Sequence, residues 1–225
     1  MRALEKVCVE LGVHFQEGVE VLDLVHDQTK LKGVKILNAE GKVKMLSSKE
    51  AVLCSGAWSS KVFKAIPVFP VKGQMLSLQG PKEALKRIIF GPGTYIVPRE
   101  DGLIVVGATS EKEAGFKEGL TPSGQHKLHE GINSLLPTAN QWPQMERWWG
   151  FRPCTPDEGP LLGSSELQGL WLATGHHRNG VLLAGITAEL LTKCICRIPL
   201  NNEENQLLKE FNWKRFGIKE NFNHY

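Results

Sequence analysis

The chain has 225 residues and a mass of 25.0 kDa, which is enough for one large domain or two small ones. It carries 27 Lys and Arg residues against 24 Asp and Glu residues, a formal net charge of +3. No Lys/Arg run forms a stripe that would neutralise phosphates, so the sequence argues against a nucleic-acid binder. Apolar residues make up 41% and charged residues 23% of the chain, which excludes disordered and collagen-like proteins.

Membrane insertion and disulfide bonding are not expected either. The longest apolar run, residues 181–195, is interrupted by glycine, polar and charged residues, and a span needs about 20 apolar residues. Residues 1–6 contain an acid where a signal peptide would begin its apolar stretch. The five cysteines are odd in number, scattered and without a Cys-x-x-Cys pair. Neither a disulfide framework nor a zinc site is expected, and a reducing, cytoplasmic setting is the simplest interpretation.

The first quarter of the chain reads as a helix followed by short strands. Apolar residues at helical spacing predict a helix over residues 2–11, which ends at Gly12. Alternating and β-branched runs then predict an antiparallel meander, with strands over residues 13–16, 19–26, 33–37 and 43–46. In residues 50–56 the apolar residues 51–54 are continuous and do not alternate with polar ones, which predicts a strand covered on both faces, either at an α/β edge or in a sandwich.

From residue 67 onward β character dominates. The patterning predicts strands over residues 71–78, 87–90, 94–98, 103–108, 145–151 and 170–174. Thr121 and Pro122 open a predicted helix that ends before Pro137. An apolar-faced helix is expected over residues 180–194, and the polar tail after Pro199 is expected to be peripheral.

The segment Gly175-His-His-Arg-Asn-Gly180 is the most informative for function. A strand, a glycine-bounded polar loop and a helix start aim several backbone N–H groups and the positive end of a helix dipole at one point. Such a site binds an electron-rich oxygen of a phosphate, a carboxylate or a flavin. A capped helix with solvated His and Arg side chains is the competing interpretation.

Arg152, Arg178 and Tyr95 form a second group of candidates. Arginine grips a carboxylate with two parallel hydrogen bonds, and the tyrosine hydroxyl can bond the same group. Surface salt bridges and an ordinary strand aromatic are the competing interpretations. His176 and His177 do not predict a metal site, because adjacent side chains diverge and no second cluster has ligand spacing.

Seven ordered segments carry a family resemblance: residues 52–59, 70–75, 95–99, 106–109, 150–153, 160–163 and 175–180. In this order they resemble the C-terminal part of the FAD-dependent amino-acid oxidases of the D-amino-acid oxidase superfamily. Within it, the chain looks most like the glycine oxidases of the thiazole (thiamine) pathway. The similarity runs from the first residues to about Cys196.

The resemblance implies a mixed α+β and α/β fold. Residues 1–66 and 148–198 would form a partial, Rossmann-like FAD-binding domain, residues 67–147 an antiparallel substrate domain, and residues 199–225 a C-terminal tail. The family's Gly-x-Gly-x-x-Gly turn does not occur in this sequence. The chain is therefore expected to correspond to the last two-thirds of such an enzyme, with an exposed apolar face that promotes homo-oligomers.

The resemblance also implies roles for individual residues. Arg152 and Arg178 would hold the substrate carboxylate, and Tyr95 would hydrogen-bond the same group. The residues expected to line FAD are Val21, Gly56, Ala57, Gly150, His176, His177, Arg178, Asn179, Gly180, Val181 and Leu182. Trp149 stands where the family usually has a small residue, which would either narrow the pocket or alter flavin access.

The activity implied by the resemblance is FAD-dependent oxidative deamination of glycine or another small amino acid. Molecular oxygen would be the second substrate, and a 2-oxo acid, ammonia and hydrogen peroxide the products. Two alternatives remain open. One is a non-catalytic or partner-dependent fragment of such an oxidase, and the other is a sarcosine-type dehydrogenase or demethylase.

Overall fold

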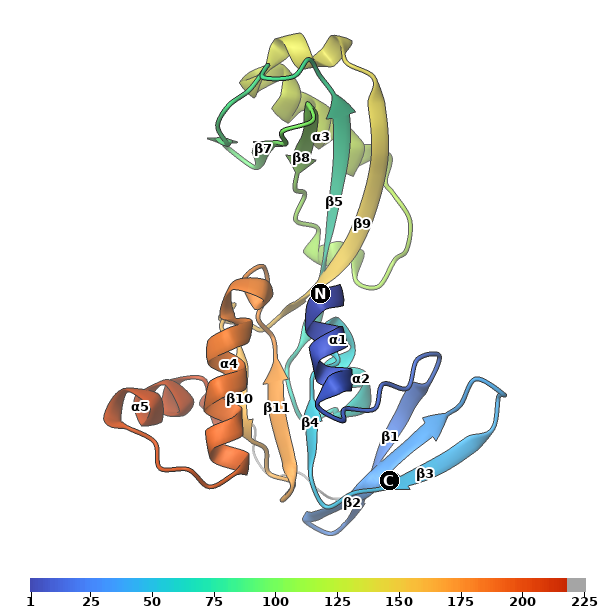
Figure 1. Ribbon diagram of the computed structural model, residues 1–225, viewed down its shortest axis with the longest axis vertical. Coiled ribbons are helices and arrows are strands. Elements are labelled where there is room, and N and C mark those ends of the chain that lie inside the picture. The colour runs from blue at the N-terminus through green and yellow to red at the C-terminus, as the bar shows by residue number, and fades with distance from the viewer. Residues whose placement is uncertain (218–225) are drawn as a thin grey trace.

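The chain folds into two parts joined by a pair of long strands (Figure 1). The computed structural model describes residues 1–217. One part is a five-stranded antiparallel sheet of order β6-β7-β8-β5-β9, with a helix packed on one face. Its elements are β5 (Phe69–Gln79), β6 (Ile89–Gly91), β7 (Thr94–Pro98), β8 (Leu103–Gly107), the helix α3 (Pro122–Leu135) and β9 (Gln144–Cys154).

Local signals and packing together place α3 on this sheet. The Thr121 side chain caps the helix by accepting a hydrogen bond from the Gly124 amide, and Pro122 occupies the first turn, where a missing N–H costs nothing. Leu128 and Ile132, four residues apart, then face the sheet. They pack in a core with residues of β5, β7 and β8, namely Leu76, Leu78, Ile96, Ile104 and Val106, and with Ala139.

The other part contains two three-stranded sheets. The first is an antiparallel meander of β1 (Glu20–Asp27), β2 (Lys30–Leu37) and β3 (Val43–Ser47). The second has the order β10-β11-β4, in which β11 runs parallel to β4 and antiparallel to β10. Its strands are β4 (Ala51–Leu53), β10 (Leu161–Ser164) and β11 (Leu170–Thr174).

The helices of this part are α1 (Arg2–Glu10), α2 (Ser59–Val62), α4 (Gly180–Ile195) and α5 (Asn202–Glu210). Short 3-10 turns complete the chain: η1 (Gly56–Trp58), η2 (Lys112–Ala114), η3 (Pro137–Gln141) and η4 (Trp213–Phe216). Helix α4 packs against β10 and β11. None of the helices in the described residues is long and apolar enough to cross a bilayer.

The sequence indicated that the segment after Pro199 is peripheral, but in the structure it packs against the rest of the chain. Asn201 and Glu204 form a reciprocal capping box that starts α5. The indole of Trp213 is only 1% exposed and packs in the core of this part together with Leu161, Leu170 and Phe63. A polar segment thus docks through one aromatic anchor, which average composition does not reveal. The expected tail beyond residue 217 lies outside the described residues.

Most of the predicted elements are confirmed, and one is wrong. Residues 13–16 form no strand, and Val13 and Phe15 are exposed, because no neighbouring strand pairs with this segment. The short strand β10 was not predicted.

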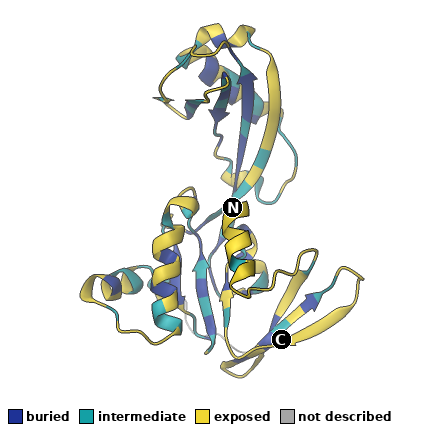
Figure 2. Ribbon diagram, viewed as in Figure 1, coloured by how far each residue is buried: buried dark blue, intermediate teal, exposed yellow. Residues whose placement is uncertain are grey.

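Helices α1 and α4 are exposed along much of their length (Figure 2). No residue of α1 is buried, and Leu4 and Val7 on it and Leu11 directly after it are exposed. On α4, Val181 and Leu182 are 94% and 83% exposed. The exposed apolar face was expected on the parallel sheet, and there Val52 of β4 is 42% exposed.

Candidate active site

The candidate site lies where the two parallel strands β4 and β11 end. Each strand leads into a glycine turn, at Gly56 after β4 and at Gly175 after β11, and both glycines have positive φ values, 55° and 76°. The hydroxyl of Ser59 donates to the Gly56 carbonyl oxygen at 2.7 Å and lies 2.6 Å from the hydroxyl oxygen of Thr174. These bonds hold the two turns side by side at the carboxyl edge of the parallel pair, where α/β sheets place their ligands.

The loop from Gly175 to Gly180 is fixed by backbone geometry. A Cβ at Gly175 would lie 2.8 Å from Cγ2 of Thr155, so this position needs glycine. The His177 amide donates a 2.7 Å hydrogen bond to the Pro153 carbonyl oxygen, and Asn179 is the N-cap residue of α4. The amides of the first turn of α4 have no acceptor within the helix, so the loop and the helix start present N–H groups at an exposed, partly apolar surface.

Arg152 lies at the end of β9, with its side chain over β5. Its Nη1 donates to the Thr109 carbonyl oxygen at 3.1 Å, and a Cβ at Gly73 would overlap its guanidinium group. Burial is the main cause that lowers the pKa of Arg152. Tyr95 raises this pKa, and Arg178 lowers it further. Arg152 on β9 is thus influenced electrostatically by Tyr95 on β7 and by Arg178 in the loop before α4.

Tyr95 and Met75 cover Gly107 on this face of the sheet. A Cβ at Gly107 would lie 2.8 Å from the Tyr95 hydroxyl oxygen and 2.7 Å from Cε of Met75. Gly73 and Gly107 thus leave room for the side chains of Arg152 and Tyr95. This face of the sheet therefore carries the Arg152 guanidinium and the Tyr95 hydroxyl.

The pKa values of both loop histidines are lowered, which disfavours their charged forms. Burial lowers the pKa of His176, whose Nε2 lies 3.0 Å from the Thr187 hydroxyl. Burial also lowers the pKa of His177, Glu158 opposes this shift, and Arg178 and Arg152 reinforce it. The positive charge of the site therefore comes from the two arginines and the helix end.

Other predicted residues stand apart from this group or are differently oriented. Val21 belongs to the separate β1-β2-β3 sheet and is exposed. Gly150 pairs with Gly73 across the β5–β9 ladder, and Ala57 is buried in η1. The assignment of these and of the other predicted residues to substrate and cofactor stays a prediction.

The Trp149 side chain points away from the face of the sheet that carries Arg152. Its ring packs against Phe151, with centroids 5.2 Å apart, and lies 5.6 Å from Nζ of Lys72. Trp149 and Arg152 are three residues apart on one strand, so their side chains point to opposite faces of the sheet. The alternation along the strand was the signal that sequence reasoning missed.

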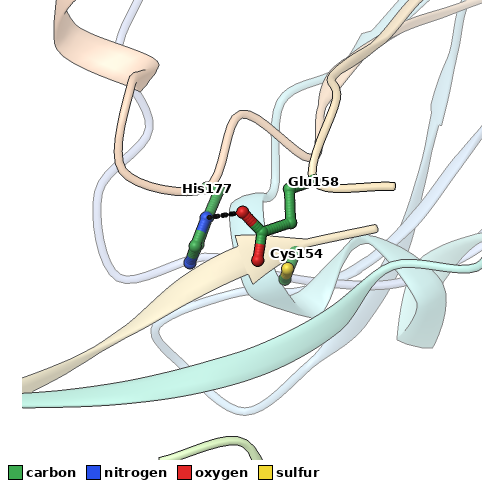
Figure 3. Close-up of side chains that lie close together, drawn as sticks. All are labelled: Cys154, Glu158 and His177. Atoms are coloured by element: carbon green, nitrogen blue, oxygen red, sulfur yellow. Dashed lines mark ion pairs between the residues drawn. The ribbon is translucent and has the colours of Figure 1, made fainter. Parts of the chain in front are cut away.

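Sequence reasoning also missed a cluster of potential metal ligands beside the site. The ligand atoms of Cys154, Glu158 and His177 all lie within 4.8 Å of one another (Figure 3). Burial and the nearby Glu158 raise the pKa of the Cys154 thiol. The three residues are spread over 24 positions, so the sequence contains no short ligand spacing that would indicate a metal site here.

A model of the FAD dependent oxidoreductase family (DAO) matches residues 1–194. The chain belongs to this family. It is 41% identical over 219 residues to the bifunctional protein ThiO/ThiG of Trichormus variabilis, which covers 96% of this chain and 32% of that protein. It is 34% identical over 180 residues to the glycine oxidase of Pseudomonas aeruginosa, covering 74% of this chain and 48% of that protein.

Solved structures of the family agree with this membership. The glycine oxidase from Bacillus cereus superposes with a TM-score of 0.77 at 28% identity, over 91% of this chain and 57% of that chain. The chain thus spans about a third of the bifunctional relative and about half of the two glycine oxidases. The mixed fold with an antiparallel sheet domain is that of the oxidases in this family.

Proposed function

We propose that this chain supplies the substrate-binding side of an FAD-dependent oxidase of glycine or another small amino acid. The observation that supports the proposal is that Tyr95 and Arg178, from two other elements, both influence the pKa of the half-buried Arg152. No hydrogen bond or ion pair with any of residues 1–217 holds the Arg178 guanidinium, so it is available to an anionic ligand. A carboxylate is the ligand that two guanidinium groups and a phenol hydroxyl bind best.

The residues present also fit the ring end of the cofactor. The amides at the start of α4 suit carbonyl oxygens, and the exposed side chains of Val181 and Leu182 offer an apolar surface that a planar ring could cover. The glycine turns at Gly56 and Gly175 allow close approach of a ligand to the backbone. No Gly-x-Gly-x-x-Gly turn occurs in the sequence, so the proposal concerns the flavin ring and not the pyrophosphate.

When bound, FAD supplies a two-electron acceptor for the amine carbon, and molecular oxygen takes up these electrons as hydrogen peroxide. The protein's own part is orientation. Arg152 and Arg178 bind the carboxylate, Tyr95 donates a hydrogen bond to it, and this fixes the α-carbon of a small amino acid. Overall, amino acid, oxygen and water would give 2-oxo acid, ammonia and hydrogen peroxide.

The decisive experiment compares Arg152→Ala with Arg147→Ala in flavin-loaded protein. Arg147 lies on the same strand and is exposed, so it serves as the matched control. Loss of a charge-assisted double hydrogen bond is expected to lower kcat/KM for glycine by about 100-fold. Peroxide formation measures the rate. Unchanged kcat/KM in Arg152→Ala would rule out the carboxylate assignment.

A second candidate is a subunit that holds FAD only together with another polypeptide segment. The exposed apolar faces of α1 and α4 favour it. Flavin content of the purified protein, measured by absorbance and after acid release, separates the two: stoichiometric flavin supports the oxidase, and flavin that appears only with the partner segment supports the subunit. Peroxide formation with glycine and with sarcosine, compared with reduction of an artificial electron acceptor, separates an oxidase from a sarcosine-type dehydrogenase.

The five free cysteines favour a reducing compartment such as the cytoplasm as the place of action.

A further inference from the structure

Three side chains with different ligand chemistry meet next to the candidate active site. Cys154 is the last residue of β9, Glu158 follows in the next turn, and His177 lies in the loop before α4. Cys154 and His177 are buried, whereas Glu158 is exposed. Nδ1 of His177 lies 3.6 Å from a carboxylate oxygen of Glu158, and all three ligand atoms lie within 4.8 Å of one another (Figure 3).

We propose that Cys154, Glu158 and His177 bind a zinc-type divalent cation. A thiolate, an imidazole and a carboxylate are the ligands that zinc takes in proteins, and three protein ligands leave a fourth position for water. Zinc-to-ligand bonds of about 2.0 to 2.3 Å in a tetrahedron put ligand atoms roughly 3.5 Å apart. Ligand atoms up to 4.8 Å apart need an inward movement of about 1 Å. The exposed Glu158 side chain can supply this movement for its own carboxylate, and rotation of the Cys154 and His177 side chains would supply it for the thiolate and the imidazole.

Charge is also balanced at this site. The thiolate of Cys154 and the carboxylate of Glu158 together neutralise a divalent cation, and His177 binds as a neutral ligand. The metal-bound site is therefore neutral, whereas the Cys154 thiol and the Glu158 carboxylate without metal carry a charge of −1 beside Arg152 and Arg178, both of which influence His177 electrostatically. The thiol proton leaves to solvent when the cation binds.

The position of the site indicates what the cation would do. Cys154 lies two residues after Arg152, and His177 lies directly before Arg178. A cation bound to Cys154 and His177 would fix the distance between the end of β9, which carries Arg152, and the loop before α4, which carries Arg178. The proposal concerns a structural or regulatory cation and does not depend on the oxidase function, since cation binding can be measured without flavin or amino acid.

Equilibrium dialysis of the full chain against Zn²⁺, followed by metal analysis, tests the proposal. The expected result is one Zn²⁺ per chain, with the Kd raised at least 10-fold by Cys154→Ala and unchanged by Cys196→Ser. Cys196 is an exposed cysteine at the end of α4, outside the cluster. Equal affinity in wild type and Cys154→Ala, or no binding by wild type, would overturn the proposal.

A second variant tests the proposal even if Cys154→Ala fails to fold. Glu158 is exposed, so Glu158→Gln should leave the fold intact, and Glu113→Gln is its matched exposed control. Zn²⁺ is expected to raise the Tm of wild type and Glu113→Gln but to raise it less in Glu158→Gln. With Co²⁺ as the probe, wild type should show a thiolate-to-metal charge-transfer band. Equal Tm shifts in both variants together with no such band would also overturn the proposal.

Discussion

The backbone amide of His177 donates a 2.7 Å hydrogen bond to the carbonyl oxygen of Pro153. This single bond joins the loop that carries Arg178 to the strand end that carries Arg152, although the two segments are 24 residues apart. It connects backbone to backbone, so side-chain substitutions in the site should leave it in place. The candidate carboxylate site is therefore built on a rigid link between β9 and the start of α4.

Gly73→Ala should impair the site without unfolding the protein. The new Cβ would overlap the end of the Arg152 side chain, which can move aside at small cost in stability. We expect a Tm close to that of wild type and, in flavin-loaded protein, a KM for glycine raised about 10-fold, because the guanidinium is displaced from the carboxylate.

A double-mutant cycle checks this explanation. Gly73→Ala combined with Arg152→Ala should be no worse than Arg152→Ala alone, since both changes act through the same guanidinium. For stability, Gly150→Ala is the matched control, because it faces Gly73 across the ladder and its Cβ would meet no atom within 4 Å. Additive losses in the double variant would contradict the explanation.

Asp157→Asn should lower the free energy of unfolding near neutral pH. At acidic pH the variant and wild type should be equally stable. Asp157 accepts two hydrogen bonds from Arg215, of 2.7 and 2.9 Å. Arg215 is the main cause that lowers the pKa of Asp157 from 3.8 to about 2. The folded-state pKa lies below the unfolded value, so the stabilisation is complete above about pH 4 and disappears as the pH falls towards 2.

The Asp157 side chain is 47% exposed, and solvent screening limits the expected loss to about 1 kcal/mol. Urea unfolding of wild type and Asp157→Asn at a series of pH values measures it, with Glu113→Gln as an exposed control. A difference in unfolding free energy that stays constant down to pH values near 2 would be inconsistent with this ion pair.

Lys72→Met should stabilise the protein. The side chain of Lys72 is fully buried, and no group among residues 1–217 accepts a hydrogen bond from Nζ. The Trp149 ring, 5.6 Å away, offers a cation–π contact of about 1 kcal/mol, which is less than the several kcal/mol that burial of an ammonium group costs.

We expect Lys72→Met to raise the free energy of unfolding by about 1 kcal/mol. Lys112→Met is the control: Lys112 is exposed and lies over the Phe69 ring, so its replacement should change stability by less than about 0.5 kcal/mol. Thermal and urea unfolding measure both variants. A lower Tm for Lys72→Met would show that the ammonium group is favourably bound where it lies.

Leu4→Glu combined with Leu11→Glu should reduce self-association. Both leucines are exposed on or directly after α1, and no residue of α1 is buried, so the double change should leave the Tm unaffected. We expect wild type to show a rise in mean mass with concentration in light scattering, and the double variant to show a smaller rise. Lys6→Glu changes the net charge by the same amount and is the matched control. A wild type that stays monomeric at high concentration would refute this expectation.

Local patterns in the sequence were sufficient for most secondary structure. Helical spacing predicted α1, Thr121 and Pro122 predicted the start of α3, and a continuous apolar run predicted β4. These signals involve residues a few positions apart, and their physical causes are local: side-chain periodicity, capping and backbone restriction. The ordered motifs likewise indicated the family.

Contacts between distant segments could be decided only by the tertiary structure. The pairing of Gly73 with Gly150 places Arg152 over β5, the docking of Trp213 brings the C-terminal segment into the core, and the return of the chain at His177 forms the cluster with Cys154. Each of these depends on strand register and on the packing of whole elements, which no local pattern encodes. The sequence thus determined which chemical groups and which helices and strands the protein has, and only folding determined which of those groups share a site.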